Sequence, residues 1–416
     1  MTDTKQQTSR PAPLDVTSVH AGVDRIILTH GAHLPIELLL AQGRLDYSAY
    51  EAWRTGEAPV LEDVLLGNPA RIRTMLEAAD DWARRLGLVP EQAPYEGWGS
   101  MAGKRLVCAR EQALCSLLET AYRRRLDRAQ ADLFLDGGEA VALIDLRTAL
   151  ATRDAERAAA SLDELLQRSP EHRLRPAAER LCDALSHLAD ARAPIDPAAE
   201  LERLHGQLNL DARELLGPSA RDFEIPFWRR LGHALTGKPF DPRRPDLHAS
   251  YAFARCLDWA AVRECIHETP AFEGEPGLLI RLIEAEIRSN NRVPAIRWLS
   301  ELCWRFHDAA DAHLAAHGID DRSMQIAWEA LCNLDTERAM DAAWFPAWLL
   351  MAEPGLASEL DLAPPTAAAD AGVAFTLLRA LLLHRDEGLD ARAIDRRRQL
   401  RDVHPALLDE FLHRFT

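Results

Sequence analysis

Residues 139–170, EAVALIDLRTALATRDAERAAASLDELLQRSP, contain two short amphipathic helical patterns joined by a polar turn. In the first pattern Leu143, Leu146 and Leu150 recur at the spacing of one helix face. The second pattern has a matching apolar stripe of Ala158, Leu162, Leu165 and Leu166. Asp154 is placed to cap the second helix and Pro170 to end it. A single helical hairpin cannot bury both stripes, so the pattern predicts neighbouring hairpins of the same kind.

Similar pairs of helical patterns recur further along the chain. The expected helices cover 173–191 and 197–216, 249–256 and 259–268, 278–289 and 292–307, 326–333 and 336–343, and finally 374–384 and 390–401 before a terminal helix. One more short helix is expected over 223–234. The segment 237–247 contains three prolines and is typical of a linker. These patterns predict helical repeats over 139–236 and 248–416.

The N-terminal part is predicted to be helical but less regular. Residues 1–14 are polar and are expected to be disordered, and residues 15–136 are expected to form an N-terminal helical domain. Within it, short helices are expected near 36–43 and 47–55, Asn68 and Pro69 open a strong helix, and leucines predict a long helix over about 104–134. The predicted fold class is therefore all-α.

Three positions in the hairpin at 139–170 match a known repeat pattern. Tetratricopeptide repeats are helical hairpins of about 34 residues with a small residue early in the second helix, a large apolar residue four later, and a closing proline. Ala158, Leu162 and Pro170 occupy these positions, and Ala295 and Leu299 occupy two of them in a later hairpin. The C-terminal two thirds of the chain thus resembles a degenerate tetratricopeptide-like repeat protein. The resemblance implies an α-solenoid of antiparallel helix pairs that binds a peptide or helix of a partner on a concave surface.

Charge and cysteine content narrow the class of protein. The chain has 49 basic and 65 acidic side chains and a formal charge of −16, which disfavours nucleic acid or anionic membrane and favours a basic or neutral partner. The seven cysteines contain no CxxC pair, as expected for buried thiols in a reducing compartment. The N-terminal residues lack the apolar core of a signal peptide. The longest nearly charge-free apolar run, Ala342 to Ala352, is interrupted by Pro346 and is shorter than the roughly 20 residues that a membrane-spanning helix needs. The chain is therefore predicted to be cytoplasmic.

Five tryptophans fall close together in the C-terminal part and are candidates for partner-binding residues. They are Trp298, Trp304, Trp328, Trp344 and Trp348. Exposed aromatic side chains are good anchors for a peptide, although tryptophans also fill the space between helix layers. No residue is predicted to be catalytic, no metal ligand is assigned and no cofactor is expected. The predicted function is a non-catalytic scaffold or adaptor for protein binding.

Two alternatives remain. His20, His30 and His33, with Asp24, Glu37 and Tyr47 nearby, would form an enzyme site in the N-terminal domain if their side chains converge. The less favoured alternative is a nucleic-acid-associated factor that uses two arginine runs. These runs are Arg123, Arg124, Arg125 and Arg128, and Arg396, Arg397, Arg398 and Arg401. Acidic neighbours make a solvated, ion-paired helix face the simpler interpretation of both runs.

Overall fold

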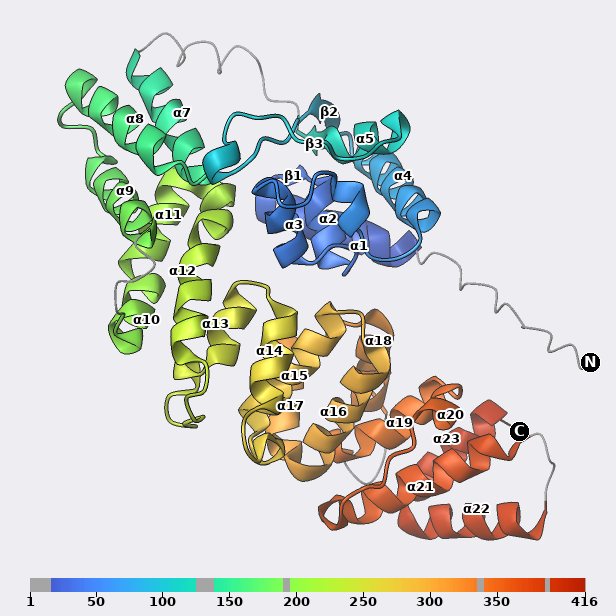
Figure 1. Ribbon diagram of the computed structural model, residues 1–416. Helices are drawn as coiled ribbons and strands as arrows, with labels where there is room; N and C mark the ends of the chain where they lie inside the picture. Colours follow the sequence, from blue (N-terminus) through green and yellow to red (C-terminus); the bar gives the residue numbers. More distant parts are fainter. Residues whose placement is uncertain (1–15, 125–137, 190–194, 335–339, 386–389, 416) are drawn as a thin grey trace, which may run out of the picture. The chain divides into compact units, whose positions relative to one another are not determined.

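The chain has an all-α fold with one small antiparallel sheet in the N-terminal part (Figure 1). The computed structural model describes residues 16–124, 138–189, 195–334, 340–385 and 390–415. The expected disorder of residues 1–14 lies outside this range. The chain divides into two compact units, Met1–Phe227 and Trp228–Thr416. The finer division expected from the sequence, with an N-terminal domain at 15–136, helical repeats at 139–236 and 248–416 and a linker at 237–247, stays a prediction.

Unit 1 begins with four helices. They are α1 (Val16–His30), α2 (Pro35–Ala41), α3 (Tyr47–Arg54) and α4 (Pro69–Arg85), with a 3-10 turn at Leu61–Val64 between the last two. The expected start of α4 is confirmed, because the Asn68 side chain accepts a hydrogen bond from the Ala70 amide and Pro69 is the first helical residue. Helix α3 buries Tyr47, Tyr50 and Trp53, as its spacing predicted.

The long helix expected over 104–134 was wrong. Within the described part of that span, 104–124, α5 (Gln112–Glu119) is the helix, and β3 (Thr120–Arg123) follows it directly. Strand β3 lies between β1 (Ala32–His33) and β2 (Val89–Gln92), and both neighbours pair with it in antiparallel register. β-Branched and aromatic residues such as Thr120 and Tyr122 favour a strand once partner strands are available. Residues 125–134 lie outside the described range.

The hairpin at 139–170 forms as its sequence predicted. Helices α7 (Gly138–Ala151) and α8 (Ala155–Arg168) are antiparallel neighbours (Figure 1). The Asp154 carboxylate accepts a hydrogen bond from the Arg157 amide at 3.0 Å and so caps α8. The two apolar stripes face each other, and Leu146, Ala158 and Leu165 are completely buried.

Three more helices belong to unit 1, and a fourth begins in it. They are α9 (Arg175–Ala189), α10 (Pro197–His205), α11 (Gln207–Leu216) and α12 (Ala220–Leu235), and α12 continues across the division between the units. The single helix expected over 197–216 was wrong, because the chain breaks at Gly206. A Cβ atom at this position would lie 2.9 Å from the Glu202 carbonyl oxygen, so the tight turn needs glycine.

Unit 2 starts with two antiparallel hairpins in chain order. The first consists of α13 (Ala249–Arg255) and α14 (Trp259–His267), and the second of α15 (Pro276–Arg288) and α16 (Arg292–Arg305). Helix α14 packs against α15, so each hairpin covers the next. Left-handed residues at Leu257 (φ 58°) and Asn290 (φ 59°) close the two turns. The sequence predicted both hairpins with nearly these boundaries.

The rest of unit 2 agrees less closely with the expected pairs. It contains α17 (His307–His317), α18 (Arg322–Cys332), α19 (Phe345–Ala352), α20 (Leu356–Glu359), α21 (Ala369–Leu383), α22 (Ala391–Val403) and α23 (Pro405–Phe415). Helix α17 was not predicted, because its small and polar residues show little periodicity. The helix expected over 336–343 lies partly outside the described range, and its described end begins a 3-10 turn at Ala342–Trp344.

One described segment is long and apolar enough to cross a membrane. It covers Thr366–Leu383, has a mean hydropathy of 1.5, and is 50% buried inside unit 2. The segment includes Asp370 and Arg379, so it is a different kind of run from the nearly charge-free Ala342–Ala352 noted in the sequence. The core helix of a globular protein passes the same test of length and composition.

Candidate functional site

The five candidate tryptophans fall into two groups by burial. Trp304, Trp328, Trp344 and Trp348 are each at most 8% exposed, whereas Trp298 is half-buried. The buried rings have neighbours inside unit 2: Trp304 lies 5.1 Å from Phe375 and Trp328 lies 5.3 Å from Phe345, measured between ring centroids. Burial favours core packing for these four side chains, and a partner-binding role for them stays a prediction. Trp298 is the one of the five whose side chain is partly packed and partly accessible to solvent.

Trp298 belongs to a cluster of three aromatic rings, which we call the aromatic patch. His267 comes from the end of α14, Phe272 from the turn that follows, and Trp298 from α16. The ring centroids are 5.2 Å apart for His267 and Phe272, 5.4 Å for Phe272 and Trp298, and 5.9 Å for His267 and Trp298. Phe272 is buried, Trp298 is half-buried and His267 is exposed. The patch therefore has a fixed apolar base and an accessible edge.

The three N-terminal histidines have three different environments. The His20 ring stacks on Trp82 with a centroid distance of 4.2 Å. His30 Nε2 lies 3.8 Å from a Glu37 carboxylate oxygen. His33 is completely buried, neither of its ring nitrogens has a hydrogen-bond partner, and burial lowers its pKa to about 4. The imidazole of His33 is therefore neutral at pH 7.

Tyr47 and Glu37 take part in contacts with the start of α12. The Tyr47 hydroxyl donates a hydrogen bond to Asp222 at 2.9 Å, and Arg221 donates two to Glu37 at 2.8 and 2.7 Å. Burial, followed by the charge of Asp222, raises the pKa of Tyr47 well above its usual range. The side chains of α2 and α3 are thus paired with the start of α12 within unit 1.

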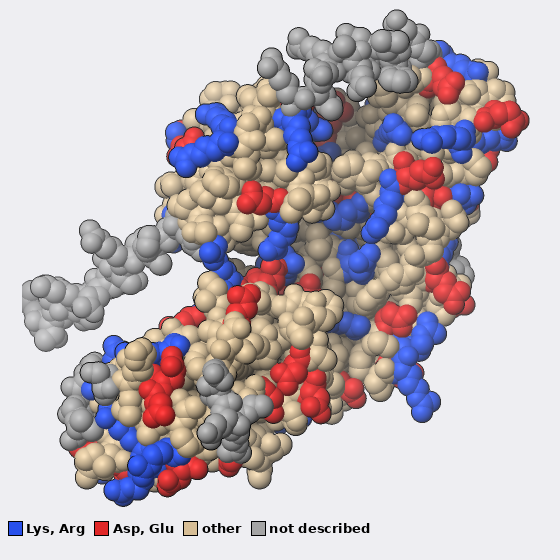
Figure 2. Space-filling model, turned by 180° about the vertical axis from the view of Figure 1, so that it is seen from behind, with Lys and Arg blue, Asp and Glu red and all other residues tan. Residues whose placement is uncertain are grey.

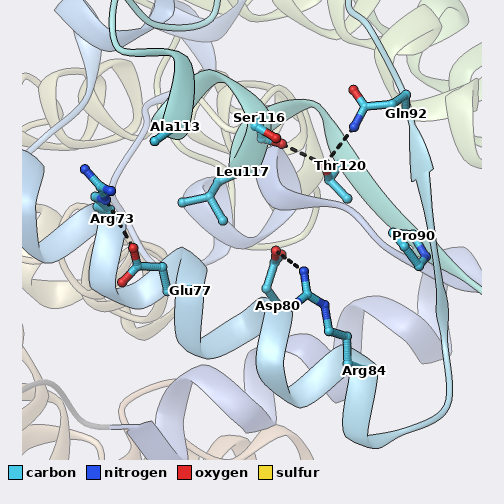
Figure 3. Close-up of a pocket in the computed structure, with 10 residues that line it drawn as sticks. All are labelled: Arg73, Glu77, Asp80, Arg84, Pro90, Gln92, Ala113, Ser116, Leu117 and Thr120. Carbon is cyan, nitrogen blue, oxygen red and sulfur yellow. Dashed lines mark hydrogen bonds and ion pairs between the residues drawn. The ribbon is translucent and has the colours of Figure 1, made fainter.

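An open pocket of about 400 Å³ lies between α4, α5 and β2 (Figure 3). Arg73 pairs with Glu77 at 3.1 Å, and Arg84 lies 3.7 Å from Asp80. Burial raises the pKa of Asp80, and the Tyr122 hydroxyl donates a hydrogen bond to it at 2.9 Å. The charges that line the pocket are thus matched within it, so the pocket presents no excess of either sign to a ligand.

Three side chains that the sequence analysis did not select lie close together on α5 and the segment before it. The sulfur atoms of Cys108 and Cys115 and a carboxylate oxygen of Glu119 are all within 4.8 Å of one another. Cys115 and Glu119 are four residues apart on α5 and so share one side of that helix. Burial, followed by the charge of Glu119, raises the pKa of the Cys108 thiol. We call this group the thiol–carboxylate cluster.

The arginine runs are only partly described. Arg123 pairs with Glu91 at 2.8 Å, and Arg125 and Arg128 lie outside the described residues. The second run lies on α22. Basic and acidic side chains are both scattered over the face of the molecule shown in Figure 2. For the first run, the ion pair of Arg123 with Glu91 fits an ion-paired, solvated face.

Comparison with known proteins gives no family for this chain. No protein-family model matches it, and neither the curated proteins nor the solved structures contain a match. The resemblance to tetratricopeptide repeats therefore rests on the sequence pattern and stays a prediction.

Proposed function

We propose that the protein is a non-catalytic scaffold that binds a peptide or helix of a partner protein through its helical hairpins. Support for this proposal comes from the hairpins α7/α8, α13/α14 and α15/α16, which pack as antiparallel pairs. Stacked hairpins bury the stripes that face each other and leave their outer helix faces free for recognition. The inner, concave surface implied by the repeat resemblance belongs to the same proposal.

The aromatic patch is the surface that we assign to this function, and its half-buried tryptophan is the observation that carries the proposal. Tryptophan provides a large apolar contact at a low entropic cost and is enriched among the residues that dominate binding energy. Exposed charged residues lie near the patch in sequence: Glu264 on α14, Glu268 as the C-cap of α14, and Arg297 next to Trp298. Two carboxylates against one guanidinium, on a chain of net charge −16, favour a basic or neutral partner.

A site-specific photo-crosslinker at position 298 tests this proposal in the cell that makes the protein. We expect a discrete crosslinked partner from position 298 and none from position 326, where Ile326 is 54% exposed on α18 in the same unit. The Trp298→Ala variant should then bind the crosslinked partner at least about 30-fold more weakly, which corresponds to about 2 kcal/mol for a dominant contact. Ile326→Ala is the matched control and should bind normally.

The charge of the partner provides a second readout. The affinity for a basic partner should fall as salt is raised, because exposed carboxylates are screened. Equal crosslinking from positions 298 and 326, or unchanged affinity of the Trp298→Ala variant, would remove the aromatic patch as the binding surface. A circular dichroism spectrum of each variant checks that the helices remain folded.

A further inference from the structure

The thiol–carboxylate cluster has the composition and spacing of a metal site. Among the residues that the structure describes, Cys108, Cys115 and Glu119 form the one group of three metal-ligating side chains close enough to share an ion. The Cys108 thiol donates a long hydrogen bond of 3.9 Å to Glu119 Oε1, so the two groups already face each other. Cys108 comes from the segment before α5, whereas Cys115 and Glu119 come from α5 itself.

We propose that Cys108, Cys115 and Glu119 bind one zinc ion. In a tetrahedral site with Zn–S bonds of about 2.3 Å and Zn–O bonds of about 2.0 to 2.2 Å, ligand atoms lie about 3.5 to 4 Å apart. The three ligand atoms here lie within 4.8 Å of one another, so a side-chain shift of about 1 Å completes the geometry. Two thiolates select zinc over magnesium or calcium, which prefer oxygen ligands. Zinc replaces the two thiol protons, which leave to solvent, and no electron transfer is involved.

The charges around the cluster balance when zinc is bound. Two thiolates and one carboxylate carry three negative charges, so a Zn²⁺ ion leaves one negative charge. Arg105 Nη2 lies 2.8 Å from Glu119 Oε2 and supplies the compensating positive charge. This pairing also leaves Glu119 Oε1 directed toward Cys108. Neutrality matters because Cys108 is completely buried and Glu119 is only 5% exposed, where an unbalanced charge is costly.

The cluster is accessible from one side. Cys115 is half-buried, so an ion can enter at this position, and a water molecule can take the fourth position of the tetrahedron. Cys108 lies in a segment before α5 that is held to other parts of unit 1 by isolated bridges, including that between Val60 and Val107, and by backbone hydrogen bonds such as that from the Glu62 amide to the Cys108 carbonyl at 2.9 Å. A bound ion would fix this segment to α5. We therefore expect bound zinc to stabilise this part of unit 1.

Metal analysis of the full-length reduced protein tests the inference. After incubation with zinc and removal of the excess, we expect one zinc ion per chain. Cobalt should give intense thiolate charge-transfer bands and the visible bands of a tetrahedral site. Cys115→Ser and Cys108→Ser should each lower zinc affinity at least tenfold, whereas Cys332→Ser, which removes an exposed thiol elsewhere, should not. Zinc should also raise the midpoint of thermal unfolding of the wild type but not of Cys115→Ser.

Two results would overturn the inference. One is that no metal stays with the wild type. Another is that the cobalt bands persist in both cysteine variants. In the first case, thiol counting after mild oxidation shows whether Cys108 and Cys115 form a disulfide. A disulfide would mark a redox pair instead of a metal site. Because Cys115 is half-buried, its substitution tests the site without removing a core side chain.

Discussion

At the residue scale, the partly buried ion pair formed by Glu37 and Arg221 should contribute measurably to the stability of unit 1. Arg221 holds both carboxylate oxygens of Glu37, which is only 15% exposed. Replacing Arg221 with Met leaves a buried carboxylate without its main partner. Since Arg221 is itself about a third exposed, we expect the free energy of unfolding of unit 1 to fall by about 2 kcal/mol, below the value for a fully buried pair.

The measurement is amide hydrogen exchange of peptides from α2, compared between wild type and Arg221→Met. The double variant Glu37→Gln with Arg221→Met is the control, because it removes the uncompensated charge and should recover part of the loss. If the double variant loses the sum of the two single losses, the pair contributes no coupling energy.

Local sequence identified one half of this contact but not the other. Glu37 was noted near the N-terminal histidines, yet Arg221 lies 184 residues further along the chain. Sequence spacing shows which residues share a helix face, but it contains no information on pairing across such a separation. The same limit applies to His20, because its stacking on Trp82 depends on the packing of α1 against α4.

At the element scale, the cap of α8 provides a direct test of what stabilises the α7/α8 hairpin. Asp154→Ala removes the hydrogen bond that the Arg157 amide donates at 3.0 Å. We expect a loss of about 1 kcal/mol in local stability, typical of an N-cap aspartate. Faster hydrogen exchange in the first turn of α8 measures this loss. Asp163→Ala, an exposed position in the middle of the same helix, should have little effect, and an equal effect of both variants would contradict the capping role.

The prediction of the hairpins was right and that of a helix over 104–134 was wrong for one physical reason: local spacing predicts a structure only when the stabilising contacts are also local. The stripes of α7 and α8 are satisfied by neighbours within about 30 residues of chain, so their periodicity predicts their structure. Strand β3 instead obtains hydrogen bonds from β1 and β2, about 90 and 30 residues away. A central strand with leucines before it resembles a helix when only local spacing is read.

The thiol–carboxylate cluster was not selected from the sequence, although two of its members lie on one helix. Cys115 and Glu119 are four apart, a spacing that places two ligands on one side of a helix. Cys108 precedes α5, so only the packing of that segment against α5 brings its sulfur close to the other two side chains. A search for CxxC pairs misses this pattern, because the two cysteines are seven residues apart.

At the scale of the whole molecule, two buried histidines make both units sensitive to acid. Burial lowers the pKa of His33 in unit 1 to about 4, and burial together with the charge of Arg281 lowers the pKa of His248 in unit 2 to about 4. In the unfolded chain a histidine binds its proton below about pH 6.5. The folded protein does not do so until about pH 4, so protonation favours the unfolded state between these values. Stability is therefore complete above pH 6.5 and falls as the pH falls from 6.5 to 4.

The expected loss at pH 5.5 is about 1 kcal/mol for each histidine, because the unfolded chain is then protonated and the folded chain is not. Hydrogen exchange at pH 7.5 and 5.5, corrected for the intrinsic exchange rate, follows unit 1 and unit 2 in the same sample. His33→Leu should reduce the loss of stability between pH 7.5 and 5.5 in unit 1 only. His248→Asn should reduce it in unit 2 only, since asparagine can still cap α13, where the His248 side chain accepts a hydrogen bond from the Ser250 amide. If the loss of stability at pH 5.5 is unchanged in both variants, other groups control the pH dependence. If either variant changes the stability of both units, the units unfold together through α12, the helix that crosses their division.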